Sequence, residues 1–323
     1  MGISRNLSVV ALGAAAIAFV ASGLSAQEKF PSKPIEIVTH SGVGGGTDIT
    51  ARMRMVEAPA KLETELVVAN RTGGSGAAAL TYASNQPKDG HTVLLMTQTH
   101  LLTLLRNKNT GVTYEDLVPL ARATDDPQVL MVGKDSPYKT AQELIEAAKT
   151  KSLKFGATGI GSGDHITTYT FAKAAGIKQP TIVPFRSGGD ITTNLVGGNL
   201  DGSLQNYTEA ESQIKAGDVR PLLVLAKDRL SIAPDVPTAG DIGLNVNLST
   251  VRGFVVLKGT PEDRVAKLEK GIVEAMEGKF YQDYLKNSGA ATASVTGAEE
   301  WGKQLDEAYA QSKVALEDLG LLK

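Results

Sequence analysis

Short runs of β-branched residues alternate with helical patterns along most of this chain, and this alternation restricts the possible fold more than any other feature. Residues 35–39 (IEIVT) and 92–97 (TVLLMT) are typical of buried strands, and a helical pattern over residues 48–63 follows the first of them. Strands that alternate with helices predict parallel sheets covered by helices on both faces. We therefore expect an α/β fold.

The same signals place the remaining elements. We expect further strands at residues 66–69, 118–123, 128–133, 153–157, 181–185, 200–204, 219–226 and 251–257. Helices are expected to begin near Thr140, Gly163, Asp190, Thr208, Pro261 and Ala298, and the chain beyond Pro261 is nearly all helical.

Residues 1–26 have the pattern of a secretory signal peptide. Arg5 precedes an uncharged apolar run at residues 7–24, and small residues lead to a cleavage site after Ala26. A membrane anchor is the alternative, since about 18 apolar residues are just enough to span a bilayer. No cysteine follows, which excludes a lipid anchor. Removal of residues 1–26 from the 323-residue chain leaves 297, enough for two lobes. We expect lobe 1 to comprise residues 27–130 and 248–323, and lobe 2 residues 131–247.

Composition excludes several classes of function. The formal charge of −2 argues against a nucleic-acid partner or an anionic membrane surface. The absence of cysteine removes disulfides, thiol catalysis and thiolate metal sites. The four histidines, at positions 40, 91, 100 and 165, lack metal-ligand spacing, and no cofactor is expected.

Three segments share one design, in which a strand, a turn rich in glycine and hydroxyl groups, and a helix follow one another. They are residues 39–48 (THSGVGGGTD), 157–165 (ATGIGSGDH) and 184–190 (PFRSGGD). A helix start presents unpaired N–H groups and partial positive charge, which suits an anion. A single loop of this kind is equally consistent with a capped helix start. Three loops in both expected lobes favour a shared anion-binding cleft.

Two phosphate motifs do not fit the first loop. A P-loop needs Lys followed by Ser or Thr at its end, but Gly46 is followed by Thr47 and Asp48. The third glycine of a dinucleotide-binding fingerprint would fall on Ile49. The anion is therefore expected to be a carboxylate.

Catalysis by Ser162 is also disfavoured. A nucleophile elbow needs glycine two residues before and after the serine, and those positions hold Ile160 and Asp164. Ser162, Asp164 and His165 share one turn at a helix start, where they do not align as nucleophile, orienter and base. An α/β transferase or hydrolase acting on an anionic metabolite remains the alternative to a binding protein.

Arg252 lies within residues 249–257, which otherwise read as a buried strand. A guanidinium in such a place needs a partner, and a bidentate carboxylate of a ligand is a suitable one. The alternative is a structural ion pair with an Asp or Glu of the chain.

Seven motifs in order resemble one family. They are residues 30–35 (FPSKPI), 44–48 (GGGTD), 70–76 (NRTGGSG), 87–95 (PKDGHTVLL), 159–165 (GIGSGDH), 233–238 (APDVPT) and 259–261 (GTP). In these blocks the chain resembles the periplasmic solute-binding proteins of tripartite tricarboxylate transporters, the Bug family. The resemblance implies a type II periplasmic-binding-protein fold, whose two lobes close on a small organic carboxylate and present it to a two-subunit membrane permease. A monomer suits such a carrier, and a sensor that presents its ligand to a receptor kinase would look the same.

The resemblance also implies the binding residues. They are Ser41, Gly45, Gly46, Thr47 and Asp48 in the first loop, Thr97, Gln98 and Thr99 after a strand, Thr158, Ser162 and His165 in the second loop, and Arg186, Ser187, Gly188 and Gly189 in the third. We add Asn206 and Arg252, which depart from the family pattern. Asn206 stands where the family more often has an acid, and Arg252 where an aromatic or small residue is more usual. Both departures favour a di- or tricarboxylate whose distal carboxylate binds Arg252.

Overall fold

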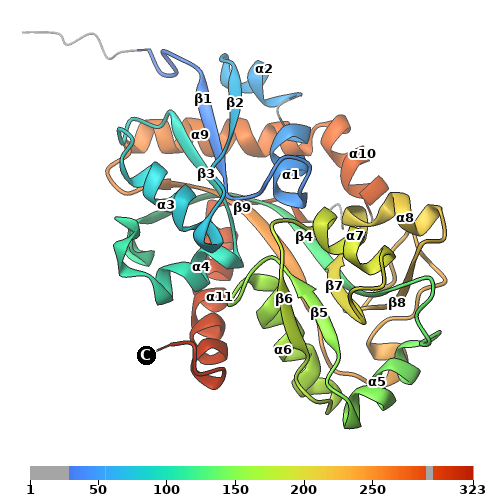
Figure 1. Cartoon of the computed structure of the whole chain (residues 1–323). Coiled ribbons are helices and arrows are strands. Elements are labelled where there is room, and N and C mark those ends of the chain that lie inside the picture. Colours follow the sequence, from blue (N-terminus) through green and yellow to red (C-terminus); the bar gives the residue numbers. More distant parts are fainter. Residues whose placement is uncertain (1–28, 55, 289–293, 323) are drawn as a thin grey trace, which may run out of the picture.

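The computed structural model describes residues 29–54, 56–288 and 294–322. The expected signal peptide, residues 1–26, lies outside them. The described chain forms two α/β lobes, one above the other in Figure 1. No helix within the described ranges is both long and apolar enough to cross a membrane.

The sheet of lobe 1 has the strand order β2-β1-β3-β9-β4, and β4 continues into lobe 2, where the order is β4-β7-β5-β6 and β8 also pairs with β4. The strands are β1 (Ile35–Thr39), β2 (Leu66–Asn70), β3 (Thr92–Thr97), β4 (Leu117–Gly133), β5 (Lys154–Ala157), β6 (Thr181–Pro184), β7 (Gly202–Asn206), β8 (Val219–Val224), β9 (Ser249–Leu257) and β10 (Thr296–Gly297). The pairs β1–β2, β1–β3, β5–β6 and β5–β7 are parallel, as expected. The pairs of β9 with β3 and β4, and of β4 with β7 and β8, are antiparallel, so the expectation of wholly parallel sheets was wrong.

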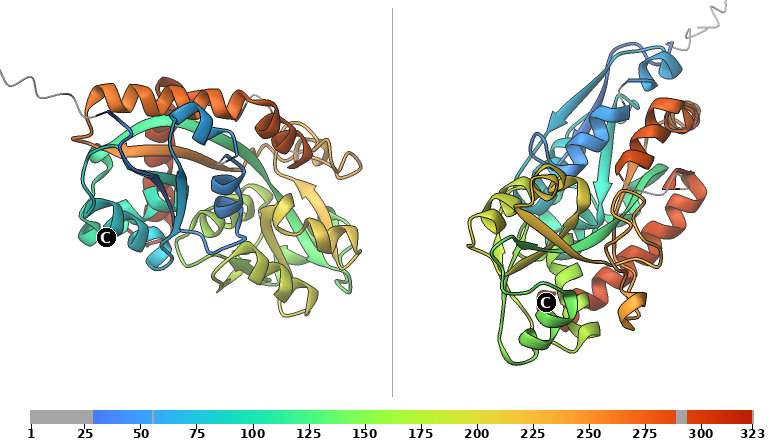
Figure 2. Two further views of the ribbon diagram at one scale, coloured as in Figure 1. Left: turned by 90° about the horizontal axis from the view of Figure 1, so that it is seen from above. Right: turned by 90° about the vertical axis from the view of Figure 1, so that its right-hand side faces the viewer.

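Helices cover both faces of these sheets, and α9 lies across the lobe 1 sheet in the left view of Figure 2. They are α1 (Gly46–Arg54), α2 (Ala58–Leu62), α3 (Ala77–Ser84), α4 (Gln98–Arg106), α5 (Ala141–Thr150), α6 (Gly163–Ala175), α7 (Gly188–Val196), α8 (Glu211–Lys215), α9 (Glu262–Glu277), α10 (Lys279–Ser288) and α11 (Ala298–Asp318). Each lobe has its own apolar core. Val93 and Phe254 belong to that of lobe 1, and Phe155 and Leu223 to that of lobe 2.

Two strands, β4 and β9, connect the lobes. Strand β4 pairs with β9 as far as Pro127 and with the lobe 2 strands from Gln128 onward. The two separate strands expected at 118–123 and 128–133 are therefore one strand of 17 residues. The polar interval between them stays extended because Asp126 faces a cation on β9 within the protein. This ribbon of two antiparallel strands joins the two lobes.

One helix prediction was wrong, and one helix was missed. The single helix expected at 48–63 is divided into α1 and α2, with Pro59 in the first turn of α2. Proline is tolerated there but disrupts a helix interior, because it lacks an N–H and its ring clashes with the preceding turn. Helix α4 was not predicted at all. Its signal was a capping box in which Thr97 and His100 bond each other's backbone N–H groups, followed by four buried leucines.

The C-terminal helix α11 contacts both lobes. Its Trp301 is buried against Gly253 of β9, and the indole Nε1 donates to the Phe254 carbonyl oxygen at 3.2 Å. At the other end of α11, Asp318 accepts hydrogen bonds from Tyr169 and Lys173 of α6. The helix therefore lies against the β4–β9 ribbon and reaches lobe 2.

Candidate functional site

The first glycine loop, residues 41–46, leads from β1 into α1 and is organised by Asp48. The Asp48 carboxylate is 1% exposed and accepts hydrogen bonds from Gly44 N at 2.9 Å, from Asn70 Nδ2 at 2.8 Å and from Arg52. Burial alone would raise the pKa of Asp48, but these hydrogen bonds outweigh burial and lower it. Asp48, predicted to bind the ligand, therefore holds the loop in shape.

Replacing Asp48 with asparagine is expected to lower the free energy of unfolding by about 1.5 kcal/mol at neutral pH, because charged hydrogen bonds are lost. The folded-state pKa of Asp48 lies below 3.8. Its contribution is therefore complete above the unfolded pKa and disappears as the pH falls through the folded value. Urea unfolding at pH 7 and pH 3 checks this. Asp190→Asn, an exposed acid in the first turn of α7, is the matched control. An equal loss in both variants would contradict the role given to Asp48.

The second glycine loop, residues 158–163, leads into α6. Ser162 caps this helix, and its Oγ accepts from His165 N at 3.3 Å. The first N–H of the helix, on Gly163, donates to Oγ1 of Thr99 in lobe 1 at 3.1 Å. Burial lowers the pKa of His165, and nearby Arg106 lowers it further, so the imidazole is neutral at pH 7. This loop thus joins the two lobes directly.

The third glycine loop, residues 185–188, leads into α7. Ser187 caps the helix by accepting from Asp190 N at 3.2 Å, and Gly188 is its first residue. The Gly188 carbonyl oxygen accepts from the buried Gln205 side chain at 2.7 Å, which fixes the loop on β7. Arg186 is exposed, and no described residue pairs with its guanidinium.

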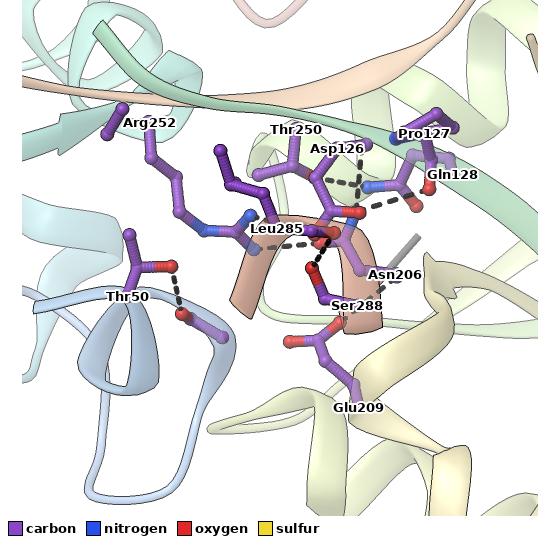
Figure 3. Close-up of polar contacts among 12 residues, drawn as sticks. Thr50, Asp126, Pro127, Gln128, Asn206, Glu209, Thr250, Arg252, Leu285 and Ser288 are labelled. Atoms are coloured by element: carbon purple, nitrogen blue, oxygen red, sulfur yellow. Dashed lines mark hydrogen bonds and ion pairs between the residues drawn. The ribbon is translucent and has the colours of Figure 1, made fainter. Parts of the chain in front are cut away.

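Arg252 lies between these loops, with its side chain 4% exposed. Its Nη1 lies 3.1 Å from Asp126 Oδ2 on β4, and its Nη2 donates to Asn206 Oδ1 on β7 at 2.8 Å (Figure 3). The Nε atom is buried and has no partner among the described residues. Burial raises the pKa of Asp126 to about 6, although Arg252 opposes this shift. Arg252 therefore forms the structural ion pair that was the alternative to a ligand contact, and its Nε donor has no partner among the described residues.

Glu209 brings the starts of α1 and α7 together. A Cβ added at Gly188 would lie 2.5 Å from Glu209 Cδ, and one added at Gly46 would lie 3.2 Å from Glu209 Oε1 and 2.6 Å from Arg252 Nη2. Burial raises the pKa of Glu209 to about 7, Arg252 opposes this, and Asp164 at the start of α6 adds to it. The starts of all three helices thus surround the Arg252–Glu209 region.

This geometry agrees with comparisons to known proteins. The model of the family described as "Tripartite tricarboxylate transporter family receptor" matches residues 50–321. The chain belongs to this family. BugT of Bordetella pertussis is 27% identical to this receptor over 330 residues, which cover both chains completely. A solved structure described as a periplasmic transporter has a TM-score of 0.83 at 26% identity, covering 90% of the receptor and 99% of that chain. MatC from Rhodopseudomonas palustris, solved with bound malate, has a TM-score of 0.78 at 25% identity, covering 89% and 100%.

These findings confirm the family resemblance, the periplasmic-binding-protein fold and the classification as a receptor rather than an enzyme. The described part of the receptor has no cluster of residues suited to a metal ion.

The receptor brings only some of the expected residues to the region around Arg252. Gly46, Gly188 and Asn206 lie there. Other predicted residues shape the loops. Gly45 packs on the Ser41 side chain, Thr97 caps α4, and Thr158 donates to Asp164. Gln98 points elsewhere, since its Nε2 donates to Ser312 of α11 at 3.2 Å and it lines a separate groove of about 740 Å³ between α6 and α11.

Three acids in this region of the receptor were missed, namely Asp126, Asp164 and Glu209. The signal for Asp126 was an acid at the centre of a strand-like stretch, opposite an arginine that needed a partner. The signal for Glu209 was its position three residues after Asn206, the spacing of a capping box, which the structure contains.

Proposed function

We propose that this receptor captures a small organic carboxylate between its lobes and delivers it to a membrane transporter. The observation that carries the proposal is the gathering of the starts of α1, α6 and α7, from both lobes, around the buried Arg252. Helix N-termini and a guanidinium together favour a carboxylate. The malate bound to MatC supports this class of ligand.

The proposed contacts come from both lobes. In lobe 1 they are Gly46 and Thr47 at the start of α1, with Thr99. In lobe 2 they are Gly163 and Gly188 at the starts of α6 and α7. Because each lobe holds part of the ligand, only the closed form makes every contact, and the ligand drives closure by binding that form more tightly.

The expected preference for a di- or tricarboxylate needs Arg252 to be available. The terminal nitrogens of Arg252 each make one hydrogen bond, Nη1 to Asp126 and Nη2 to Asn206, and each carries a second N–H group. A distal carboxylate would therefore share the guanidinium with Asp126, through a second N–H group or through the unpartnered Nε. This preference stays a prediction that a panel of ligands tests.

The remaining parts of the proposal concern export, oligomeric state, lobe motion and the membrane permease. The receptor is exported to the periplasm, cleaved after about Ala26, and acts as a monomer. The two lobes, residues 27–130 with 248–323 and residues 131–247, rotate about the β4–β9 ribbon. A permease of two subunits recognises the closed form.

Thermal unfolding of residues 27–323 with mono-, di- and tricarboxylates, amino acids, sugars and nucleotides tests the function. A ligand that binds only the native state at 100 times its Kd stabilises it by about 2.7 kcal/mol. We expect a shift of this size with at least one carboxylate and none with sugars. Stabilisation by a nucleotide alone would contradict the proposal.

A pair of variants in the same loop controls this test. In Gly46→Ala the new methyl group would clash with Arg252, and the carboxylate that the thermal-unfolding panel identifies should no longer bind. In Gly42→Ala the methyl group meets nothing within 4 Å, and binding should be unchanged.

A further inference from the structure

Glu209 occupies the space between two helix starts that belong to different lobes. It is the last residue of the 3-10 turn Tyr207–Glu209, and its Oε2 accepts from Asn206 N at 3.3 Å. The carboxylate is so close to Gly188 that an added Cβ there would lie 2.5 to 2.8 Å from Cδ and both oxygens. Figure 3 shows Glu209 next to the Arg252–Asp126–Asn206 group.

Hydrogen-bond acceptors are left unused in this region. Asp164 Oδ2 accepts from Thr158 N at 3.0 Å and from Thr158 Oγ1 at 2.6 Å. Among residues 29–54, 56–288 and 294–322, none donates to the other oxygen, Oδ1, or to Glu209 Oε1. Two carboxylate oxygens from different elements therefore have no donor among the described residues, and neither is fully buried, so both are open to solvent or to a ligand.

Acidic side chains also outnumber basic ones among the described residues of this region. Among the described residues, Asp126, Asp164 and Glu209 share the guanidinium of Arg252, which contacts Asp126 and Asn206 directly. Histidines do not compensate, because burial, with a smaller effect of Arg252, lowers the pKa of His40 to about 4. Burial raises the pKa of all three carboxyl groups, which favours their protonated forms, and a further cation in this region would favour their charged forms.

An independent observation points to a ligand in the same place. Arg252 Nε is a donor on a side chain that is 4% exposed, and it has no described partner. In Figure 3 this nitrogen lies on the side of the guanidinium away from Asp126, whereas Gly46 at the start of α1 lies nearest to Nη2. The unpartnered donor of Arg252 thus lies in the same region as the unpartnered oxygens of Asp164 and Glu209. A ligand that carries both an acceptor and a donor would satisfy both kinds of group.

We propose that the ligand is a small amino acid, whose carboxylate binds the α1 start and Arg252 Nε and whose ammonium group binds Glu209, with Asp164 adding negative charge. This inference rests on the proposed function and names the class of carboxylate. The ammonium group supplies the missing cation, whereas a second carboxylate would add a further anion to the three already present.

The pH dependence of binding has opposite signs for the two ligand classes. Arg252 of β9, Asp126 of β4 and Asp164 of α6 face Glu209, whose pKa in the unliganded receptor is about 7. An ammonium group lowers this pKa, so binding releases a proton and affinity rises with pH. A second carboxylate raises the pKa, so affinity falls. Asp126, with a pKa of about 6, changes affinity in the same direction, whereas His40 does not titrate in this range.

Calorimetric titration at pH 6 and pH 8 tests the inference with L-glutamate, L-alanine, 4-aminobutyrate, succinate, glutarate and butyrate. We expect an amino-bearing probe to bind most tightly, with affinity about three- to tenfold higher at pH 8 than at pH 6. Glu209→Gln should lower that affinity at least about tenfold and remove most of the pH dependence. Glu211→Gln, two residues along the chain and paired with Lys215, is the matched control and should change neither.

Two outcomes would overturn the inference while the proposed function stands. One is tightest binding by succinate or glutarate, with affinity that falls as the pH rises. The other is tighter binding of a diacid by Glu209→Gln with no loss for the amino-bearing probes, which would mean that Glu209 merely occupies the ligand's place. If none of the six probes binds and no carboxylate shifts the thermal unfolding, the proposed function itself fails.

Discussion

Replacing Arg252 with alanine is expected to lower the free energy of unfolding by about 3 to 4 kcal/mol at pH 8, the largest effect of any single change considered for this receptor. Arg252 is the cation that Asp126 contacts at 3.1 Å, and it also donates to Asn206. Its removal leaves the Asp126 carboxylate buried and unpaired. Denaturation by urea, followed by circular dichroism, measures the loss.

The loss of unfolding free energy in Arg252→Ala should depend on pH. The folded-state pKa of Asp126, about 6, is above its usual 3.8, and removing Arg252 raises it further. In the Arg252→Ala variant the Asp126 carboxyl is therefore mostly protonated at pH 5. The loss of stability should accordingly be smaller at pH 5 than at pH 8. The double variant Arg252→Met with Asp126→Asn should recover part of the stability that Arg252→Met loses. A loss under about 1 kcal/mol at pH 8 for Arg252→Ala would contradict the pairing.

Gly253→Ala is expected to destabilise the receptor by about 3 kcal/mol through overpacking. The added methyl group would lie 2.3 Å from Cε2 and 2.5 Å from Cζ2 of Trp301, which is 3% exposed. The ring has little room to move, because its Nε1 donates to the neighbouring Phe254 carbonyl oxygen. Urea unfolding at neutral pH measures the effect.

Two further variants identify the cause of that loss. In Gly189→Ala the methyl group would meet only Ser187 Oγ, at 3.8 Å, so stability should stay the same or rise slightly. Combining Gly253→Ala with Trp301→Phe removes the part of the ring that clashes, and the pair should cost less than the sum of the two single changes. Strict additivity would mean that Trp301 is not the residue that the methyl group meets.

Local sequence signals predicted the strands and helix starts that surround the candidate site. Strands at 35–39 and 92–97 and the helix starts at Gly163 and Ala298 are confirmed, because alternating apolar residues, glycine turns and capping residues act within a few positions. The start of α1 at Gly46 lies two residues before the expected position. The family resemblance, spread over seven short motifs, is confirmed by the family model.

Pairings between distant residues were not predictable in the same way. Arg252 was recognised as a cation that needed a partner, but the partner, Asp126, is 126 residues away and meets it only because β4 and β9 are adjacent. Asn206 and Glu209 join them because β7 also pairs with β4. Hence the sequence suggested an anionic ligand, whereas the proposal of a ligand that also carries a cation depends on charges that only the fold brings together.

The position of Trp301 has an experimental consequence. It is the only tryptophan of the chain, and it lies against β9 beside Gly253, next to the residue that holds the candidate site together. Indole emission depends on the polarity and packing around the ring, so excitation of this chain at long ultraviolet wavelength reports on a single location. That location is the ribbon about which the lobes would turn. The receptor thus contains its own optical probe of the proposed hinge motion, and no attached dye is needed to follow it.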